Sequence, residues 1–140
     1  MAKPVTVLAL LTDLALPTFG CMELQPARFD AEARRLSVSA HIGAEFADGQ
    51  GLVRGGFFAA VLDDVMTGAV ILALGGQAEP RLLTQSLDYL CGAGPGEFTA
   101  EGWVVSVGPD YCLTRGELRG PNGELAAMAQ GVVARNTGDG

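Results

Sequence analysis

The sequence predicts an α+β domain in which one long apolar helix packs against a strongly curved antiparallel sheet. Two observations carry this prediction. A long apolar stretch begins at Gly55 and continues to about Leu74, where Gly75 and Gly76 are expected to end a helix. Four stretches with strand character follow, with no second helix between them. A helix that is apolar on all sides has to be buried by other parts of the protein, and in this chain a sheet is the available element.

The composition fits a single globular domain over residues 1–140. Hydrophobic residues make up 49% of the chain and charged residues 18%, values that exclude a disordered chain. The formal net charge is -7 and no basic stripe is visible, so we expect no nucleic-acid partner. Three cysteines without C-x-x-C spacing favour free thiols in a reducing, cytoplasmic location over disulfides or a zinc site. We expect neither a metal nor a cofactor.

The N-terminal part predicts a short amphipathic helix from about Val5 to Leu14, in a region that Pro17 ends. Lys3 followed by an apolar run resembles a secretory signal. However, Asp13 interrupts the run and no A-x-A cleavage site follows, so we expect no leader. Residues 21–29, CMELQPARF, have the character of a short strand.

The next strand is expected over Arg35–Ile42, because apolar and polar residues alternate there without exception. The alternation places His41, the single histidine, on the polar face of the strand. A solvated side chain is therefore favoured over a catalytic one. The turn-rich stretch from Glu45 to Arg54 then leads to the long apolar helix.

The apolar stretch is long enough to suggest a membrane span. Two aspartates, Asp63 and Asp64, lie near its centre, and each would cost about 2.5–3.5 kcal/mol on insertion scales. Gly55, Gly56 and Gly68 also reduce its apolar surface. We therefore expect a core helix of a water-soluble protein and no membrane partner.

The C-terminal half supplies most of the sheet. The expected strands are Arg81–Cys91, Glu97–Val107, Tyr111–Arg119 and Glu124–Ala134. Glycine- and proline-containing stretches separate them, and Asn122-Gly123 is a strong indicator of a tight hairpin. The last three strands should form an antiparallel meander.

The junction between the loop and the long helix carries the candidate chemistry. Gly55 and Gly56 open the helix, so their N–H groups belong to a first turn without partners inside the helix. Those donors and the positive end of the helix dipole could hold a developing oxyanion. Asp63 lies just over two turns further along and returns to about the same face. A thioester threaded between them could meet an oxyanion hole at one end and a carboxylate, acting through water, towards the other.

A purely structural interpretation stays open beside this one. The two glycines could serve close packing alone, while Asp63 and Asp64 pair with arginines. Adjacent residues on a helix point about 100° apart, so the two carboxylates cannot share one role. We expect one of them to be catalytic and the other to be structural or to face the rim of a site.

The stretch from Asp48 to Asp64, DGQGLVRGGFFAAVLDD, resembles the signature of hotdog-fold acyl-CoA thioesterases of the phenylacetate-degradation (PaaI-like) type. That signature reads Asn-x-x-Gly-x-x-His-Gly-Gly, followed on the helix by an acid at the spacing that Asp63 has here. The resemblance extends over most of the chain, through LLTQSLDYL, PGEFTAEGWVVSVG and NGELAAMAQGVV. The spacing from the glycine pair to the acid is its specific part.

The resemblance implies a hotdog fold, in which the curved antiparallel sheet wraps around the long central helix. It implies hydrolysis of an acyl-CoA thioester to the free acid and CoA, with CoA as part of the substrate. It also implies two protomers that pair their sheets and place the active sites at the dimer interface. We expect a homodimer or a homotetramer, a dimer of dimers, because a single curved sheet would leave an edge strand and an apolar face exposed.

The resemblance also assigns roles to single residues. Asp63 matches the helix acid that activates water or attacks the thioester. Gly55 matches the oxyanion-hole donor, with Gly56 beside it. Substrate binding is expected of Asp48, Arg54, Asp64, Thr84 and Ser86, and either Thr84 or Ser86 would enter from the partner subunit to orient water.

Two residues depart from the family pattern. Arg54 stands where the family has histidine, and Asp48 stands where it has asparagine. A guanidinium cannot accept a proton, and a carboxylate cannot donate as an amide does. Polarisation of the thioester carbonyl could therefore be altered, or Arg54 and Asp48 could form a compensating ion pair. Arg54 is also left free to meet a phosphate of coenzyme A.

These departures keep two rival interpretations open. The first is a non-hydrolytic acyl-CoA-binding or regulatory hotdog protein. The second is a structural dimer in which the buried acids are merely paired.

Overall fold

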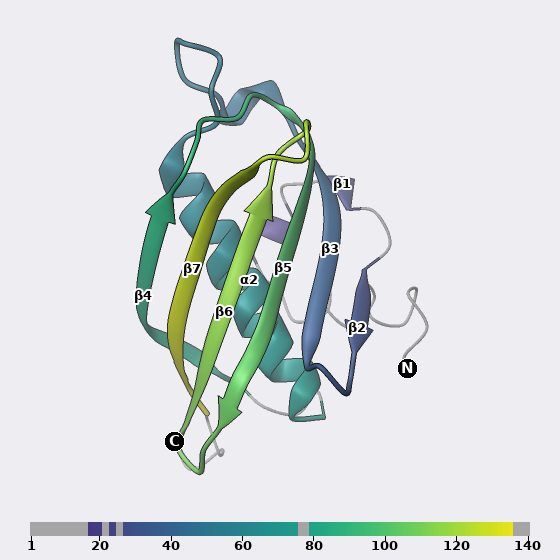
Figure 1. Cartoon of the computed structure of the whole chain (residues 1–140), viewed down its shortest axis with the longest axis vertical. Helices are drawn as coiled ribbons and strands as arrows, with labels where there is room; N and C mark the ends of the chain where they lie inside the picture. Colours follow the sequence, from purple (N-terminus) through teal and green to yellow (C-terminus); the bar gives the residue numbers. More distant parts are fainter. Residues whose placement is uncertain (1–16, 21–22, 25–26, 76–78, 136–140) are drawn as a thin grey trace.

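A curved antiparallel sheet lies against one long helix in the computed structural model of this chain (Figure 1). The structure describes residues 17–20, 23–24, 27–75 and 79–135. The helix expected over Val5–Leu14 lies outside these residues. Along the chain the elements are η1 (Pro17–Gly20), β1 (Glu23–Leu24), β2 (Arg28–Asp30), β3 (Arg35–Ile42), η2 (Ala44–Phe46), α2 (Gly55–Ala73), β4 (Arg81–Tyr89), β5 (Gly96–Val107), β6 (Tyr111–Arg119) and β7 (Leu125–Ala134).

The sheet has seven strands in the order β1-β3-β5-β6-β7-β4, with β2 also paired to β3. All the pairs are antiparallel, and β5, β6 and β7 form the expected meander. Strand β4 follows the helix and lies at the outer edge of the sheet, at the left in Figure 1. Among the described strands its only partner is β7. The predicted α+β hotdog architecture is thus confirmed.

The expected single strand over residues 21–29 is wrong. Two short strands lie there, and both pair with β3. Leu24 lies opposite Ala40, whereas Arg28 lies opposite Ser37. Leu24 and Arg28 are four residues apart, whereas their partners on β3, Ala40 and Ser37, are three residues apart. The pairing register with β3 therefore shifts by one residue between β1 and β2. Such an offset leaves one extra residue on the side of the two short strands, and Ala27 lies outside both of them.

The other strands lie close to their predicted positions. Strands β3 and β6 have the predicted bounds. Strand β4 ends at Tyr89 instead of Cys91, since Leu90 and Cys91 both direct their N–H groups to Ala126 O, at 2.8 and 3.4 Å. The polar face of β3 carries His41, whose Nδ1 lies 3.1 Å from Glu97 Oε1 in an exposed pair.

The hairpin between β6 and β7 is confirmed as a tight turn. The N–H of Gly120 donates to Glu124 O, and the N–H of Gly123 donates to Gly120 O, each at 2.9 Å. Gly123 has a φ of 81°, which a residue with a Cβ rarely adopts. The sequence Asn122-Gly123 therefore supplies the conformation that the turn requires.

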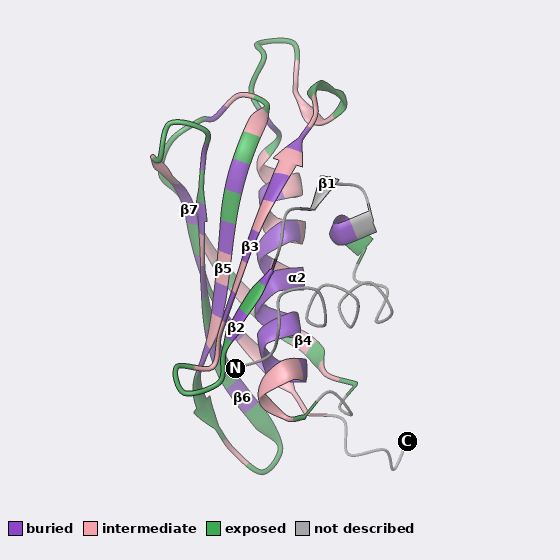
Figure 2. Ribbon diagram, turned by 90° about the vertical axis from the view of Figure 1, so that its right-hand side faces the viewer, coloured by how far each residue is buried: buried purple, intermediate pink, exposed green. Residues whose placement is uncertain are grey.

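Helix α2 lies along the concave side of the sheet, and its middle turns are buried (Figure 2). It is long and apolar enough to cross a membrane, yet 61% of the 18-residue window concerned is buried inside the protein. Gly75 follows with a φ of 86° and donates its N–H to Leu72 O at 3.3 Å, which ends the helix as predicted.

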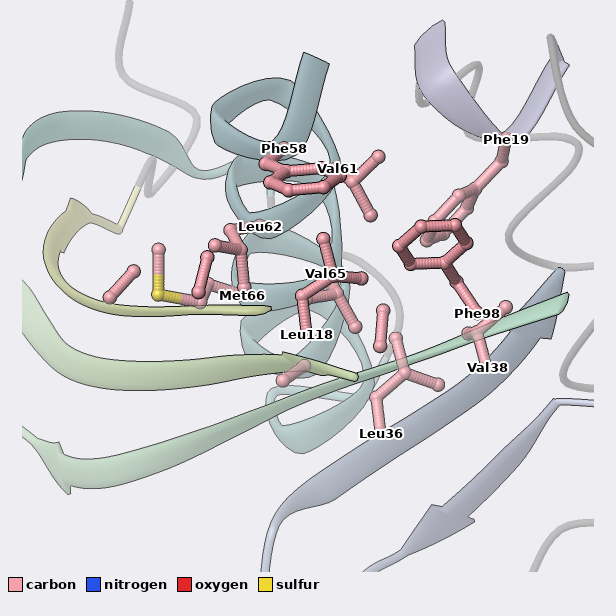
Figure 3. Packing of buried hydrophobic residues seen from close by; sticks show 14 of the residues in the cluster. Phe19, Leu36, Val38, Phe58, Val61, Leu62, Val65, Met66, Phe98 and Leu118 are labelled. Atoms are coloured by element: carbon pink, nitrogen blue, oxygen red, sulfur yellow. The ribbon is translucent and has the colours of Figure 1, made fainter. Parts of the chain in front are cut away.

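The hydrophobic core lies between α2 and the inner face of the sheet (Figure 3). The backbone of Val65 and Met66 meets strand β5 at Gly102. At that point a Cβ on Gly102 would come within 2.6 Å of Val65 O, so the strand can approach only because residue 102 is glycine. This packing fixes the position of α2 and, with it, the position of its N-terminus.

Candidate active site

A groove of about 540 Å³ lies where the loop before α2, the first turn of α2 and the end of β4 meet. It is lined by Asp48, Phe58 and residues 52–56 and 89–92. Four residues predicted for the site therefore come together here, namely Asp48, Arg54, Gly55 and Gly56.

The loop before α2 is held by its own hydrogen bonds. Asp48 Oδ1 accepts the N–H groups of Gln50 and Leu52, at 2.8 and 3.2 Å. These two bonds, with a smaller contribution from the charge of Arg54, hold the pKa of the exposed Asp48 carboxyl below its usual value. The N–H of Val53 donates to Ala93 O at 2.9 Å, which anchors the end of the loop. The loop thus delivers Arg54 to the N-cap position of α2 in a defined place.

The compensating ion pair considered for Arg54 and Asp48 is not formed. The salt bridges among the described residues join other partners, and the Asp48 carboxylate is used by the backbone of its own loop. Arg54 is exposed at the rim of the groove, without a carboxylate partner in the described part of the chain. Its guanidinium is therefore available to an anionic group of a ligand.

The first turn of α2 presents two free donors to the groove. Arg54 O accepts the N–H groups of Phe57 and Phe58, at 3.0 and 3.3 Å. The N–H groups of Gly55 and Gly56 have no acceptor among the described residues, as expected for the start of a helix. Both glycines line the groove, so their N–H groups and the positive helix end can act together on a carbonyl oxygen.

Tyr89, at the end of β4, forms the wall of the groove beside these donors. Its hydroxyl donates a hydrogen bond to Gly55 O at 3.0 Å. A Cβ on Gly55 would lie 3.2 Å from two atoms of the Tyr89 ring, so the ring rests directly on that glycine. No motif in the sequence marks Tyr89 as a site residue, and only its place in the alternation of the strand could have indicated that it faces the helix.

Asp63 and Asp64 lie in different surroundings. Asp64 is 6% exposed, and its Oδ2 accepts both the N–H and the hydroxyl of Thr18 at 2.7 Å. Burial raises the pKa of its carboxyl, while the bonds from Thr18 act in the opposite direction. Asp63 is half-buried, and its Oδ1 accepts the Thr67 hydroxyl at 3.0 Å. Neither aspartate forms a salt bridge within the described residues, so the pairing with arginines that the structural interpretation required is not observed there.

Asp63 does not line the groove of the single chain. It lies on the side of α2 that begins at Gly55, in the groove, and continues along the helix. Gly55, Ala59 and Asp63 recur at every fourth residue and so follow one side of α2. Strand β4 meets the first two of them, because Tyr89 bonds to Gly55 O and Gln85 Nε2 donates to Ala59 O at 3.1 Å. Asp63 is the next residue on this side of α2.

Thr84 and Ser86 are not brought to the groove. They lie opposite Val132 and Gln130 of β7 and are exposed. Because side chains alternate along a strand, and Gln85 between them contacts α2, both hydroxyls face away from the helix. They line a separate hollow of about 360 Å³ on the outer face of the sheet.

The two described cysteines differ in their surroundings. Cys91 is exposed and lies in the groove, where its thiol donates to Leu125 O at 3.5 Å. Cys112 is buried in the core, and burial raises the pKa of its thiol. The described part of the chain contains no cluster of three or more His, Cys, Asp or Glu residues suited to a metal.

Comparison with known proteins identifies the family. The model of the thioesterase superfamily matches residues 50–127, which include the start of α2 and both aspartates. A phenylacetic acid degradation-related protein of Ralstonia eutropha JMP134 is 27% identical, with 86% of this chain and 89% of that chain covered at a TM-score of 0.75. No curated protein matches.

Two more distant structures show the same fold. A hypothetical thioesterase protein of Streptococcus pneumoniae TIGR4, solved with coenzyme A, is 18% identical at a TM-score of 0.74, covering 90% of this chain and 94% of that one. Thioesterase superfamily member 2 of zebra fish is 17% identical at 0.79, covering 97% and 100%. Because the family model covers more than half of the sequence and the chain has the hotdog fold of these neighbours, the protein belongs to the thioesterase superfamily.

Proposed function

We propose that the protein hydrolyses acyl-CoA thioesters to the free acid and CoA. Membership of the thioesterase superfamily supports thioester hydrolysis in general. The coenzyme A in the fold neighbour from Streptococcus pneumoniae supports an acyl-CoA as the substrate. One observation carries the proposal: the N–H groups of Gly55 and Gly56, which have no acceptor among the described residues, belong to glycines that line a groove at the start of α2. Asp63 lies further along the same side of this helix as Gly55.

This arrangement supports the following reaction. The thioester carbonyl oxygen accepts hydrogen bonds from the first turn of α2, which stabilise the negative charge that develops on it. Asp63 takes a proton from a water molecule while the water oxygen forms a bond to the carbonyl carbon. The carbon–sulfur bond then breaks, and the proton passes to the CoA thiolate. Direct attack of the Asp63 carboxylate on the carbonyl carbon is the alternative route, in which the carbon–sulfur bond breaks and CoA leaves as the thiolate. Water then cleaves the mixed anhydride to the free acid and the Asp63 carboxylate, and the proton released passes to the CoA thiolate.

A second copy of the chain is part of the proposal. Strand β4 has an unpaired edge among the described strands, and long free edges are avoided in native proteins. Pairing two β4 edges would continue the sheet, would enclose the side of α2 that carries Asp63, and would keep the loops at residues 92–96 and 108–110 outside the seam. A dimer, or a dimer of two such dimers, would thus complete the site.

The hydroxyls of Thr84 and Ser86 are left out of this mechanism. Extending a sheet at its edge preserves its two faces, so both side chains would stay on the face opposite α2. The role expected for them, to orient water, therefore finds no support in the geometry. Gln85 and Leu87 lie on the face that the helix covers.

Arg54 and Asp48 have separate roles in the proposal. Arg54, exposed at the rim, would bind a phosphate of coenzyme A through a charge-assisted hydrogen bond. Asp48 stabilises the loop by accepting hydrogen bonds from its backbone. Its carboxylate has no N–H group that could donate to the thioester carbonyl oxygen. Asp64 holds η1 against the helix through its bonds from Thr18 and has no part in the proposed chemistry.

A non-hydrolytic acyl-CoA-binding protein is the second candidate. It is favoured by the two departures from the family pattern. Arg54 cannot accept a proton as histidine can, and Asp48 cannot donate a hydrogen bond as the amide of asparagine can. Release of CoA thiol from a panel of acyl-CoAs, together with calorimetric binding of a non-hydrolysable thioether analogue, separates the two. Thiol release that disappears in Asp63→Asn supports hydrolysis. Tight binding without thiol release by the parent would establish the binding protein instead.

A further inference from the structure

The end of β4 reaches over the helix start and contacts its backbone through one side chain. Tyr89 donates its hydroxyl to Gly55 O at 3.0 Å and rests its ring against the same residue. About one turn further along α2, Ala59 O accepts a hydrogen bond from Gln85 Nε2 of the same strand at 3.1 Å. Two side chains, spaced four residues apart on β4, thus bind carbonyl groups spaced four residues apart on α2.

The carbonyl that Tyr89 contacts belongs to the same peptide group as one of the free donors. The C=O of Gly55 and the N–H of Gly56 form one planar amide with a shared π system. A hydrogen bond accepted by the carbonyl oxygen draws electron density towards that oxygen and makes the N–H at the other end a stronger donor. The N–H of Gly56 is unpaired among the described residues and lines the groove.

We propose that Tyr89 is a positioning residue that orients and polarises the Gly55–Gly56 peptide, so that the Gly56 N–H becomes the stronger of the two donors to the thioester carbonyl oxygen. This inference rests on the proposed function. Tyr89 acts through the backbone of α2, since its hydroxyl is directed to Gly55 O and not into the groove.

The glycine at position 55 fits this role. A Cβ there would press on two atoms of the Tyr89 ring at 3.2 Å, whereas a Cβ on Gly56 would meet nothing within 4 Å. A side chain at position 55 would therefore push the Tyr89 ring away from its present place by a few tenths of an ångström. At Gly56 the space that a side chain would occupy is open for a ligand.

The test replaces each of the two tyrosines of the chain in turn. Tyr89→Phe removes the hydroxyl and keeps the ring against Gly55. Tyr111→Phe is a matched control, because Tyr89 and Tyr111 are both 54% exposed and the Tyr111 hydroxyl has no partner among the described residues. Cooperative strengthening by 10–30% of a donor that contributes about 10²–10³ to kcat predicts a fall in kcat of about two- to eightfold for Tyr89→Phe. KM and the melting temperature should stay at the parent value, and Tyr111→Phe should match the parent throughout.

A second measurement is independent of turnover. In a ¹⁵N–¹H correlation spectrum the amide resonance of Gly56 should move in Tyr89→Phe, because its own peptide group loses the hydrogen bond. The Gly55 amide, which belongs to the preceding peptide group, should move less. Tyr111→Phe should leave both resonances in place.

The two measurements separate the inference from the proposed function. An unmoved Gly56 resonance overturns the inference, whether or not the parent hydrolyses acyl-CoAs. Equal kcat values for the parent and both variants also overturn it when the parent is active. A parent that hydrolyses no acyl-CoA while Gly56 still moves contradicts the proposed function and supports the polarisation of the peptide.

Discussion

Asp63 and Asp64 are adjacent in the sequence, but the fold places them in opposite situations. Asp64 is buried, and one of its oxygens accepts two hydrogen bonds from Thr18, a residue of η1. Asp63 is half-buried and has a single partner, Thr67, one turn along the same helix. Its Oδ2 has no hydrogen-bond partner within the described residues. The difference arises because neighbouring helical residues point about 100° apart.

The comparison shows how one helix can carry two acids for two purposes. A carboxylate that accepts both donors of a distant residue joins two parts of the fold. A carboxylate with one local partner and one free oxygen can still accept a proton from water. Asp64 therefore stabilises the contact between η1 and α2, while Asp63 is the candidate for the chemistry.

The largest expected effect is on turnover. Asp63→Asn keeps the shape of the side chain and removes its basicity, so acyl-CoA hydrolysis should fall by about 10²–10⁴. Asp64→Asn should change turnover far less. Steady-state release of CoA thiol by both variants, with thermal melting to confirm folding, makes the measurement. An inactive Asp64→Asn beside an active Asp63→Asn would reverse the assignment.

The next effect is on stability and concerns Thr18. Thr18→Val removes the hydroxyl that donates to the buried Asp64 and leaves that carboxylate with the backbone N–H alone. Loss of a hydrogen bond to a charged group predicts a decrease in the free energy of unfolding of about 1.5–3 kcal/mol. Turnover should stay at the parent value. Urea denaturation measures the change, and an unaltered midpoint would remove Asp64 from its structural role.

Thr67→Val is the matching change on the other acid. It removes the hydroxyl bond to Asp63, so the carboxylate loses its fixed orientation. A loss of about 1 kcal/mol of transition-state stabilisation corresponds to a fall in kcat of about fivefold. Thr67→Ser should restore most of it, because the serine hydroxyl can make the same bond. Equal decreases in kcat for Thr67→Val and Thr18→Val would contradict the assignment of a catalytic role to Asp63 and a structural role to Asp64.

The smallest effect is a change in the pH dependence of stability. Burial raises the pKa of Asp64 in the folded state, so its protonated form is the one that folding favours. Its contribution to stability is therefore fully present below the unfolded pKa and is lost as pH rises through the raised, folded pKa. Asp64→Asn cannot ionise, so its melting temperature relative to the parent should rise as the pH increases from about 4, near the unfolded pKa, through the raised pKa of the folded state. A constant difference across this range would contradict the cause given for the shift.

Local patterns in the sequence predicted most of the elements. Strand β3 has its predicted bounds because alternation of apolar and polar residues reflects one covered face. Strand β6 has its predicted bounds because glycine- and proline-containing stretches flank it on both sides. The helix over Gly55–Ala73 was predicted because glycines bracket an apolar run. Strand β4 was predicted two residues too long, since its end depends on Ala126 O, an acceptor that lies far away in the sequence.

The candidate site was predictable in part. Gly55 and Gly56 followed from the general property of a helix start, and the expectation that Asp63 and Asp64 have different roles followed from the helical angle. The sequence did not indicate which of the two acids is hydrogen-bonded to another element, because Thr18 lies 46 residues from Asp64. Tyr89 escaped prediction for the same reason, as 34 residues separate it from Gly55.

The sequence by itself determined what depends on neighbours along the chain. This includes the helix, the alternation of the strands, the tight turn at Asn122-Gly123 and the spacing from the glycine pair to Asp63. Only the tertiary structure decided which side chains meet across the fold, because such contacts depend on the curvature of the sheet and on the placement of α2 within it. The bond from Thr18 to Asp64 and the bond from Tyr89 to Gly55 are of this second kind, since packing joins elements that no local periodicity relates.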